Sequence, residues 1–169
     1  AVSKFHAIDE IMEAYDDGQT LFGESRVQEL QDKHPELPQD IEWHFIGSLQ
    51  RNKVRFIAPF VSLIHSLDSA RLMREIDNRA AQNNRVIRCL LQLHVADEET
   101  KSGFSPDECR EFLDSGNWKK YPNVEIVGVM GMATFTEDAE QVRSEFKQIK
   151  ALFEEFKANH FADNDNFKE

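Results

Sequence analysis

Short apolar segments alternate with amphipathic helical patterns along the chain, and this alternation limits the possible folds more than any other feature. Six segments are apolar enough to form strands: residues 1–3, 20–23, 42–47, 61–67, 86–95 and 125–130. Most of them are apolar on both faces, which is typical of parallel strands covered by helices. We therefore predict an α/β fold built on a parallel sheet.

Helical patterns fill the intervals between these segments. Apolar stripes at helical spacing cover residues 8–15 and 70–80. Ser105, with Glu108 three residues later, forms the sequence signature of a capping box that opens a third helix. The longest pattern runs over residues 136–156 and carries a phenylalanine stripe, which we expect to pack on the sheet.

Two architectures fit this alternation, a doubly wound open sheet and a TIM barrel. A dinucleotide-binding sheet requires a glycine-rich turn after an early strand, and the sequence contains neither that turn nor a P-loop. Polar residues instead follow several predicted strands, at Lys4, at Glu24-Ser25, after Gly47 and at residues 101–103. Because functional residues at many strand ends are characteristic of the barrel, we predict a (β/α)8 TIM barrel. Residues 1–169 then form a single partial barrel domain with six βα units.

The charge and the cysteines exclude several classes of function. The formal net charge of −11 leaves no basic surface for nucleic acid or an anionic membrane. No apolar run approaches the roughly 20 residues of a membrane helix, and the first residues lack the order of a secretory signal. Cys89 and Cys109 form no CxxC pair, so we expect neither a disulfide framework nor a zinc site. A protein of the reducing cytoplasm fits these features.

Lys4 ends the first apolar segment and is the first candidate for chemistry. A lysine at a strand end is usually a solvated rim residue. An amine at the mouth of an apolar pocket, in contrast, has its pKa lowered by desolvation, and the neutral amine attacks a carbonyl to form a Schiff base. The sequence alone leaves both interpretations open. If Lys4 is a Schiff-base lysine, we expect an apolar pocket around its amine.

Ordered motifs in and after the predicted strands resemble a known family. The motifs are Ala1-Val2-Ser3-Lys4, Phe22-Gly23-Glu24, Val27-Gln28-Glu29-Leu30, Trp43-His44-Phe45-Ile46-Gly47, Ile64-His65-Ser66 and Gly128-Val129-Met130-Gly131-Met132. This series, which runs essentially from end to end, resembles the pyridoxal 5′-phosphate (PLP) homeostasis proteins, single-domain relatives of the alanine racemase barrel. The resemblance implies a barrel of the alanine-racemase N-terminal-domain type, PLP as the cofactor, and a role in vitamin B6 homeostasis rather than substrate turnover.

The resemblance also implies the cofactor-binding residues. Lys4 corresponds to the lysine that forms the Schiff base with PLP. Ser25 stands where this family usually carries asparagine, so a contact to the phenolic oxygen of the cofactor is either lost or bridged by water. His44 is either a cofactor contact or a satisfied histidine facing the barrel interior. Met130 packs either on the pyridine ring or simply within the barrel.

Two further segments carry two interpretations each. Lys101-Ser102-Gly103 is either a polar loop in which Gly103 permits a turn, or a mobile rim over the cofactor. Asn52-Lys53 is expected to open a short helix, and its side chains are either functional or ordinary surface.

The chain departs from the family pattern at both ends. It begins inside the first strand, without the family's leading helix, and Asn166-Phe167-Lys168-Glu169 falls where a seventh strand begins. The later stretches that hold the cofactor phosphate in this family are not in the sequence. We therefore expect residues 1–169 alone to bind PLP weakly or not at all, because the phosphate supplies most of the electrostatic attraction.

Three classes of function remain. The first is a PLP carrier or homeostasis protein, with apo PLP enzymes as possible partners. The second is a PLP-dependent amino-acid racemase or decarboxylase. Racemisation requires a second base, which racemases take from an added β-domain that this sequence has no room for. The third is an α/β scaffold in which Lys4 is only structural.

Overall fold

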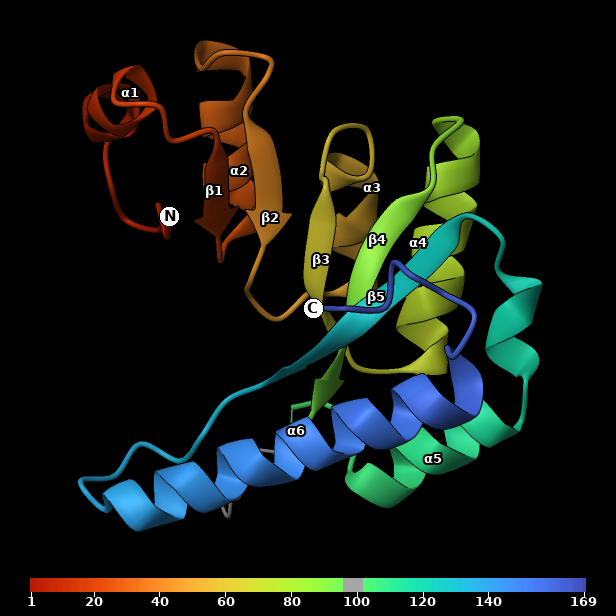
Figure 1. The fold of residues 1–169 in the computed structure, drawn as a ribbon. Helices are drawn as coiled ribbons and strands as arrows, with labels where there is room; N and C mark the ends of the chain where they lie inside the picture. Colours follow the sequence, from red (N-terminus) through yellow and green to blue (C-terminus); the bar gives the residue numbers. More distant parts are fainter. Residues whose placement is uncertain (96–101) are drawn as a thin grey trace.

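A five-stranded parallel sheet is the centre of the molecule in the computed structural model, which describes residues 1–95 and 102–169 (Figure 1). The strands are β1 Leu21–Glu24, β2 Glu42–Phe45, β3 Leu63–Leu67, β4 Ile87–Leu93 and β5 Val124–Gly131. They are hydrogen-bonded in the order β1-β2-β3-β4-β5, and every neighbouring pair is parallel. The predicted parallel α/β fold is therefore confirmed.

The strand order distinguishes between the two predicted architectures. A doubly wound sheet reverses its strand order at a switch point, whereas a barrel adds each strand beside the one before it. Here the order is sequential throughout, as in a barrel. The terminal residues continue the order at both edges: the Ser3 amide donates to the Gly23 carbonyl at 3.0 Å beside β1, and the Lys168 amide donates to the Val127 carbonyl at 2.9 Å beside β5.

The prediction of a full strand at residues 1–3 is wrong. Only Val2 pairs with the sheet, through an isolated parallel bridge to Gly23. The pairing stops there because the chain turns immediately afterwards, where the His6 amide donates to the Ser3 carbonyl at 3.1 Å. The six predicted strands are thus five strands and one bridge.

The helices are α1 Ile8–Asp16, α2 Val27–Lys33, α3 Val54–Ile57, α4 Ala70–Gln82, α5 Pro106–Asp114 and α6 Ala139–His160. A short 3-10 helix, Arg51–Lys53, precedes α3 and confirms the short helix expected at Asn52-Lys53. The capping box before α5 is present, since the Ser105 hydroxyl accepts from the Glu108 amide at 3.2 Å. The longest helix begins later than predicted because Asp138 is its N-cap, and the carboxylate accepts from the Glu140 and Gln141 amides.

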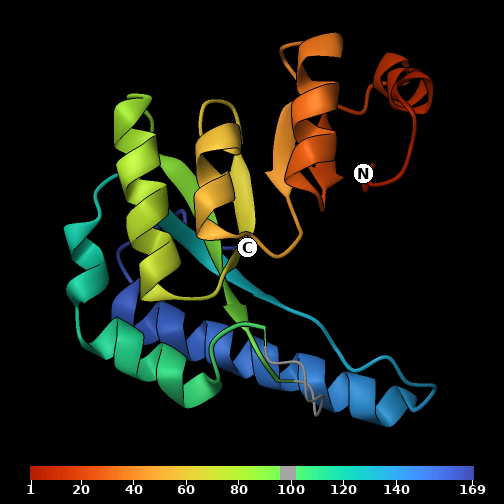
Figure 2. The same cartoon turned by 180° about the vertical axis from the view of Figure 1, so that it is seen from behind.

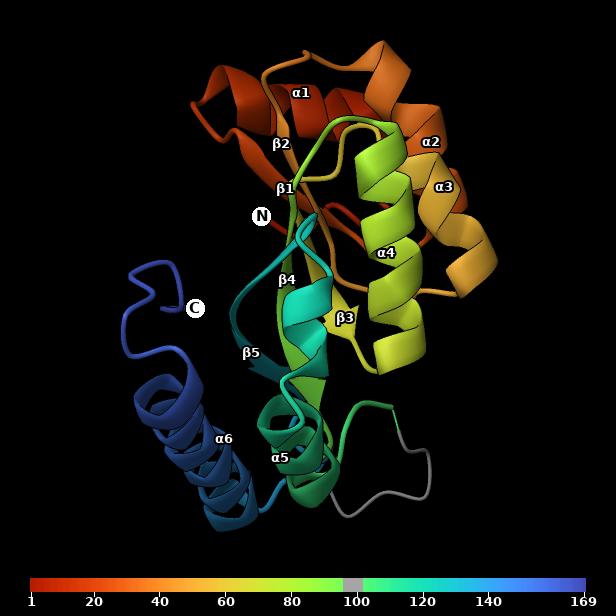
Figure 3. The same ribbon diagram turned by 90° about the vertical axis from the view of Figure 1, so that its right-hand side faces the viewer.

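The two faces of the sheet have different coverings. Helices α2, α3 and α4 lie side by side on one face (Figures 2 and 3). The main core lies between that face and the helices, and its largest fully buried strand residues are Phe22, Trp43, Phe45 and Ile64. The opposite face, which we call the inner face, carries a smaller cluster of Leu63, Leu90 and Val127. Alternate residues of a strand point to opposite faces, so this second set corresponds to the interior side of a barrel.

Neither cysteine of the chain forms a disulfide, and both Cys89 and Cys109 are buried. Burial raises the pKa of the Cys109 thiol to about 12. Among the described residues, no helix combines the length and the apolar character that crossing a membrane requires.

Candidate functional site

Lys4 lies on a tight turn that joins the Val2 bridge to α1. The turn is closed by the hydrogen bond from the His6 amide to the Ser3 carbonyl, and Phe5 has a φ of 67°, in the left-handed region. Lys4 itself is exposed, and within the described residues its amine has no hydrogen bond or ion pair. The expected apolar pocket around this amine is therefore not present in the described structure. The position at the carboxyl end of a sheet segment agrees with the prediction.

A buried network of charged groups lies directly beneath this turn. The Glu24 carboxylate is fully buried at the end of β1, and its Oε1 accepts from the Ser3 hydroxyl and from the Lys33 ammonium, both at 2.7 Å. Lys33 Nζ also donates to the Ser3 carbonyl at 2.9 Å, and the Lys33 side chain is 9% exposed. Since Ser3 immediately precedes Lys4, the network fixes the backbone from which the Lys4 side chain extends.

Ser25 follows Glu24, and Lys4 follows Ser3. Because the Ser3 and Glu24 side chains are hydrogen-bonded to each other, Ser25 and Lys4 lie close together at the carboxyl end of the sheet. Ser25 is half-buried, and its hydroxyl makes no hydrogen bond within the described part of the chain. The loop after β2 crosses here so closely that a Cβ on Gly47 would lie 2.0 Å from the Ser25 carbonyl oxygen. The loops after β1 and β2 therefore meet at the carboxyl end of the sheet.

His44 and His65 form a pair on the inner face. His44 Nδ1 and His65 Nε2 are 3.0 Å apart, and one of the two nitrogens donates to the other. The pair lines a cavity of about 290 Å³ together with Leu63, Leu90 and Val127. His44 Nε2 is buried and has no partner there. The His44 ring faces inward from β2 and contacts the neighbouring strand, but its unpaired Nε2 means that the histidine is only partly satisfied, so a contact to the cofactor stays a prediction.

Burial lowers the pKa of both imidazoles. Desolvation, followed by the nearby charges of His65 and Arg88, lowers the pKa of His44 from 6.5 to about 4. Desolvation also lowers the pKa of His65, while the Glu169 carboxylate acts in the opposite direction. The pair is thus neutral at neutral pH.

This pairing predicts a loss of stability in mild acid. Between pH 6.5 and about 4 the unfolded chain binds a proton at residue 44 that the folded chain does not, so the free energy of unfolding should fall as the pH falls. Urea unfolding followed from neutral pH down to about 4 measures this slope. His44→Gln, which cannot titrate, should flatten the slope, and an unchanged slope in that variant would contradict the assignment.

Met130 lies on the inner face near the end of β5. It is half-buried and packs against the Leu63, Leu90 and Val127 cluster. Met130 therefore contributes to packing on the inner face. A contact between Met130 and a cofactor ring stays a prediction.

The predicted loop after β4 is only partly described, because Lys101 lies outside the described residues. Gly103 has a φ of 108°, in the region that favours glycine, so the turn expected there is confirmed. The Phe104 amide then donates to the Gln92 carbonyl at 2.8 Å, and the chain returns to the edge of β4.

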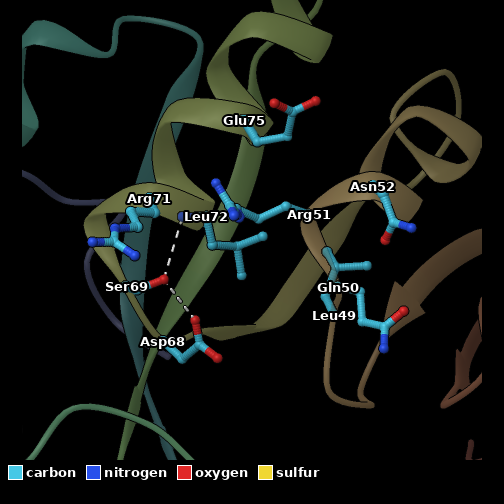
Figure 4. A pocket seen from close by; sticks show the side chains of 9 residues that line it. All are labelled: Leu49, Gln50, Arg51, Asn52, Asp68, Ser69, Arg71, Leu72 and Glu75. Carbon is cyan, nitrogen blue, oxygen red and sulfur yellow. Dashed lines mark hydrogen bonds between the residues drawn. The ribbon is translucent and has the colours of Figure 1, made fainter.

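A second hollow, of about 580 Å³, lies between the loop after β2 and the first turn of α4 (Figure 4). The Arg51 side chain extends toward α4, and Asn52 lies on the opposite wall (Figure 4). Ser69 caps α4, accepting from the Leu72 amide at 3.3 Å. The sequence indicated polar residues after Gly47 and a short helix at Asn52-Lys53 in this region, but it gave no sign of a hollow.

The fold and this site together define a class of protein. It is a parallel α/β domain with sequential strand order and a lysine directly after the segment that pairs beside β1. The family model described as "Alanine racemase, N-terminal domain" matches residues 1–164. The chain belongs to this family, and within it to the group of the pyridoxal phosphate homeostasis proteins.

Two curated relatives and one solved structure illustrate the similarity. The pyridoxal phosphate homeostasis protein of Aquifex aeolicus is 40% identical over 151 residues, which cover 89% of this chain and 65% of that protein. The protein of the same name from Haemophilus influenzae is 33% identical, covering 93% of this chain and 67% of that protein. The chain therefore spans about two thirds of the length of these relatives.

Among solved structures, PipY of Synechococcus elongatus PCC7942 without PLP is 34% identical, with a TM-score of 0.88 over 95% of this chain and 74% of PipY. The same protein with PLP bound aligns with a TM-score of 0.83 over the same shares. The predicted α/β fold of the alanine-racemase N-terminal-domain type is therefore confirmed.

Proposed function

We propose that this chain binds PLP through a Schiff base to Lys4 and serves PLP homeostasis rather than substrate turnover. The observation that carries the proposal is the amine of Lys4, which has no partner within the described residues and stands on a turn fixed by buried charges at the carboxyl end of the sheet. The relatives named pyridoxal phosphate homeostasis proteins and the PLP-bound PipY structure support it.

The residues present fit an aldehyde cofactor at this position. PLP, when bound, would supply an aldehyde at this position, and the amine of Lys4 would hold it. Lys33, the other lysine nearby, is unsuited to this reaction because its ammonium is held by the Ser3 carbonyl and by the Glu24 carboxylate. Lys4 is thus the lysine of this region whose amine has no hydrogen bond or ion pair within the described residues.

Further residues are proposed to line the cofactor. Ser25, whose hydroxyl has no hydrogen bond within the described residues, is proposed to face the cofactor from the neighbouring strand end. His44 and Met130 are proposed to shape the inner-face side of the site, beside Leu63 and Val127. We further propose that residues 1–169 act as one domain in the cytoplasm and that apo PLP enzymes receive the cofactor.

The alternative is a PLP-dependent racemase or decarboxylase, which the family similarity also allows. A racemase removes the α-proton and replaces it with a solvent proton, whereas a decarboxylase releases CO2 and places a solvent proton on the α-carbon, so in heavy water both introduce deuterium at that carbon. We expect PLP to produce a visible absorbance band that borohydride reduction removes, and amino acids to show no α-proton exchange in heavy water. Enzyme-dependent exchange would contradict the carrier function, and the absence of any visible band at high PLP would contradict binding.

A further inference from the structure

The turn that carries Lys4 is strained. Phe5, directly after Lys4, adopts a φ of 67°, which glycine takes readily and a bulky residue does not. Such a conformation persists in a protein only where surrounding contacts enforce it. The strain lies one residue from the proposed nucleophile, so the contacts that enforce it also determine the position of Lys4.

Glu29 of α2 supplies the most direct of these contacts. Its Oε2 accepts from the Phe5 amide at 3.0 Å, across 24 residues of sequence. This backbone hydrogen bond is the main cause that lowers the pKa of Glu29, with Lys33 and Arg26 contributing. The carboxylate is therefore charged at neutral pH and forms a charge-assisted hydrogen bond, which is stronger than one between neutral groups.

Lys33 joins this contact to the buried network. Its ammonium lies 3.5 Å from Glu29 Oε2 and 2.7 Å from Glu24 Oε1, and it donates to the Ser3 carbonyl. Helix α2 therefore holds the chain on both sides of Lys4, at the Ser3 carbonyl before it and at the Phe5 amide after it. Lys4 is the residue between these two attachments, and its amine has no hydrogen bond or ion pair to residues 1–95 or 102–169.

We infer that Glu29, together with Lys33 and Glu24, forms a positioning clamp that holds the strained Ser3–His6 turn so that Lys4 is directed at the cofactor aldehyde. The inference rests on the proposed function, because it assigns the clamp a role in PLP capture. Glu29 acts through the backbone and does not touch the cofactor. Holding the backbone on both sides of Lys4 restricts the region that its amine can reach, which lowers part of the entropic cost of the condensation.

The test variant is Glu29→Ala, which removes the acceptor of the Phe5 amide. We expect the yield of borohydride-trapped Lys4 adduct, at a fixed PLP concentration below saturation, to fall about tenfold, corresponding to about 1.4 kcal/mol. Hydrogen exchange at the Phe5 amide should accelerate by a similar factor, and this readout is independent of PLP.

Asp77→Ala is the matched control. The Asp77 carboxylate of α4 accepts from the Asn123 amide at 2.9 Å, so it also ties a backbone amide to a helix, but at the amino end of β5. This variant should lose a comparable local contact without changing the Lys4 adduct yield. If the effect of Glu29→Ala were only a general loss of stability, Asp77→Ala would lower the yield as well.

Phe5→Gly provides a rescue. Glycine adopts a positive φ without strain, so the turn needs less external support. In the Glu29→Ala background this second change should restore most of the lost adduct yield. The aromatic ring of Phe5, which packs under the Arg26 guanidinium at 4.9 Å, is lost in the same change, so Phe5→Gly alone is the reference for the double variant.

The outcomes separate the clamp from the proposed function. An adduct yield of Glu29→Ala within about twofold of the unchanged chain, or unchanged exchange at the Phe5 amide, overturns the clamp. An equal loss of yield in Asp77→Ala also overturns it. If the unchanged chain takes no PLP at Lys4 at any concentration, the proposed function and the assigned role in PLP capture both fail, and the exchange measurement then decides whether Glu29 holds the turn.

Discussion

Replacing Lys4 with alanine is expected to abolish covalent capture of PLP. The amine is the nucleophile of the proposed Schiff base, and the other nearby lysine, Lys33, is held in a buried ion pair with Glu24. The borohydride-stable adduct, measured by intact mass after reduction, should therefore disappear. Lys4→Arg should lose the adduct as well, because guanidinium stays protonated and cannot condense with the aldehyde.

Lys53→Ala is the matched control for this prediction. Lys53 is an exposed lysine at the same end of the sheet, where it lies over the Phe56 ring and takes no part in the proposed site. The adduct yield of this variant should equal that of the unchanged chain. Equal yields in Lys4→Ala and in the unchanged chain would show that PLP reacts with surface amines in general, and would contradict the proposal.

The second large effect is expected at Glu24. The carboxylate is fully buried and is the nearest counter-charge of Lys33, whose side chain is 9% exposed, so Glu24→Ala leaves that ammonium with the more distant Glu29 carboxylate at 3.5 Å. Breaking a buried ion pair on one side costs about 3–5 kcal/mol, and we expect the free energy of unfolding to fall by that amount. Urea unfolding followed by tryptophan fluorescence measures it.

A double replacement tests the physical reason for that loss. Glu24→Leu with Lys33→Met removes both charges and keeps apolar volume in their place, and such exchanges are often close to neutral. The double variant should therefore be clearly more stable than Glu24→Ala. If it is equally unstable, the loss comes from packing or from the Ser3 hydroxyl, and not from an unpaired charge. The double variant should still capture PLP poorly, because the Ser3 carbonyl has lost its donor.

The sheet could be predicted from the sequence because its strands carry long apolar runs. The 86–95 segment contains β4, Ile87–Leu93, and the 125–130 segment lies within β5. Helix α2, Val27–Lys33, was not predicted, since seven residues give too little periodicity to distinguish a helix from a loop. The bridge at Val2 was predicted as a strand because apolar residues alone do not show where a turn ends the pairing.

The candidate site was predictable only in part. The place of Lys4 at a sheet end follows from the sequence, but its exposure does not, since burial depends on elements distant in the chain. Glu24 and Lys33 are nine residues apart, and they meet only when α2 packs beside β1. The sequence assigns His65 no role, because its pairing with His44 depends on the register between β2 and β3.

The central claim is that Lys4 is the residue that holds PLP. The most direct measurement is borohydride reduction of the chain with PLP, followed by proteolysis and mass spectrometry of the modified peptide. We expect one dominant phosphopyridoxyl modification, located on Lys4. A dominant modification on Lys33 or on another lysine, or an even distribution over the exposed lysines, would contradict it.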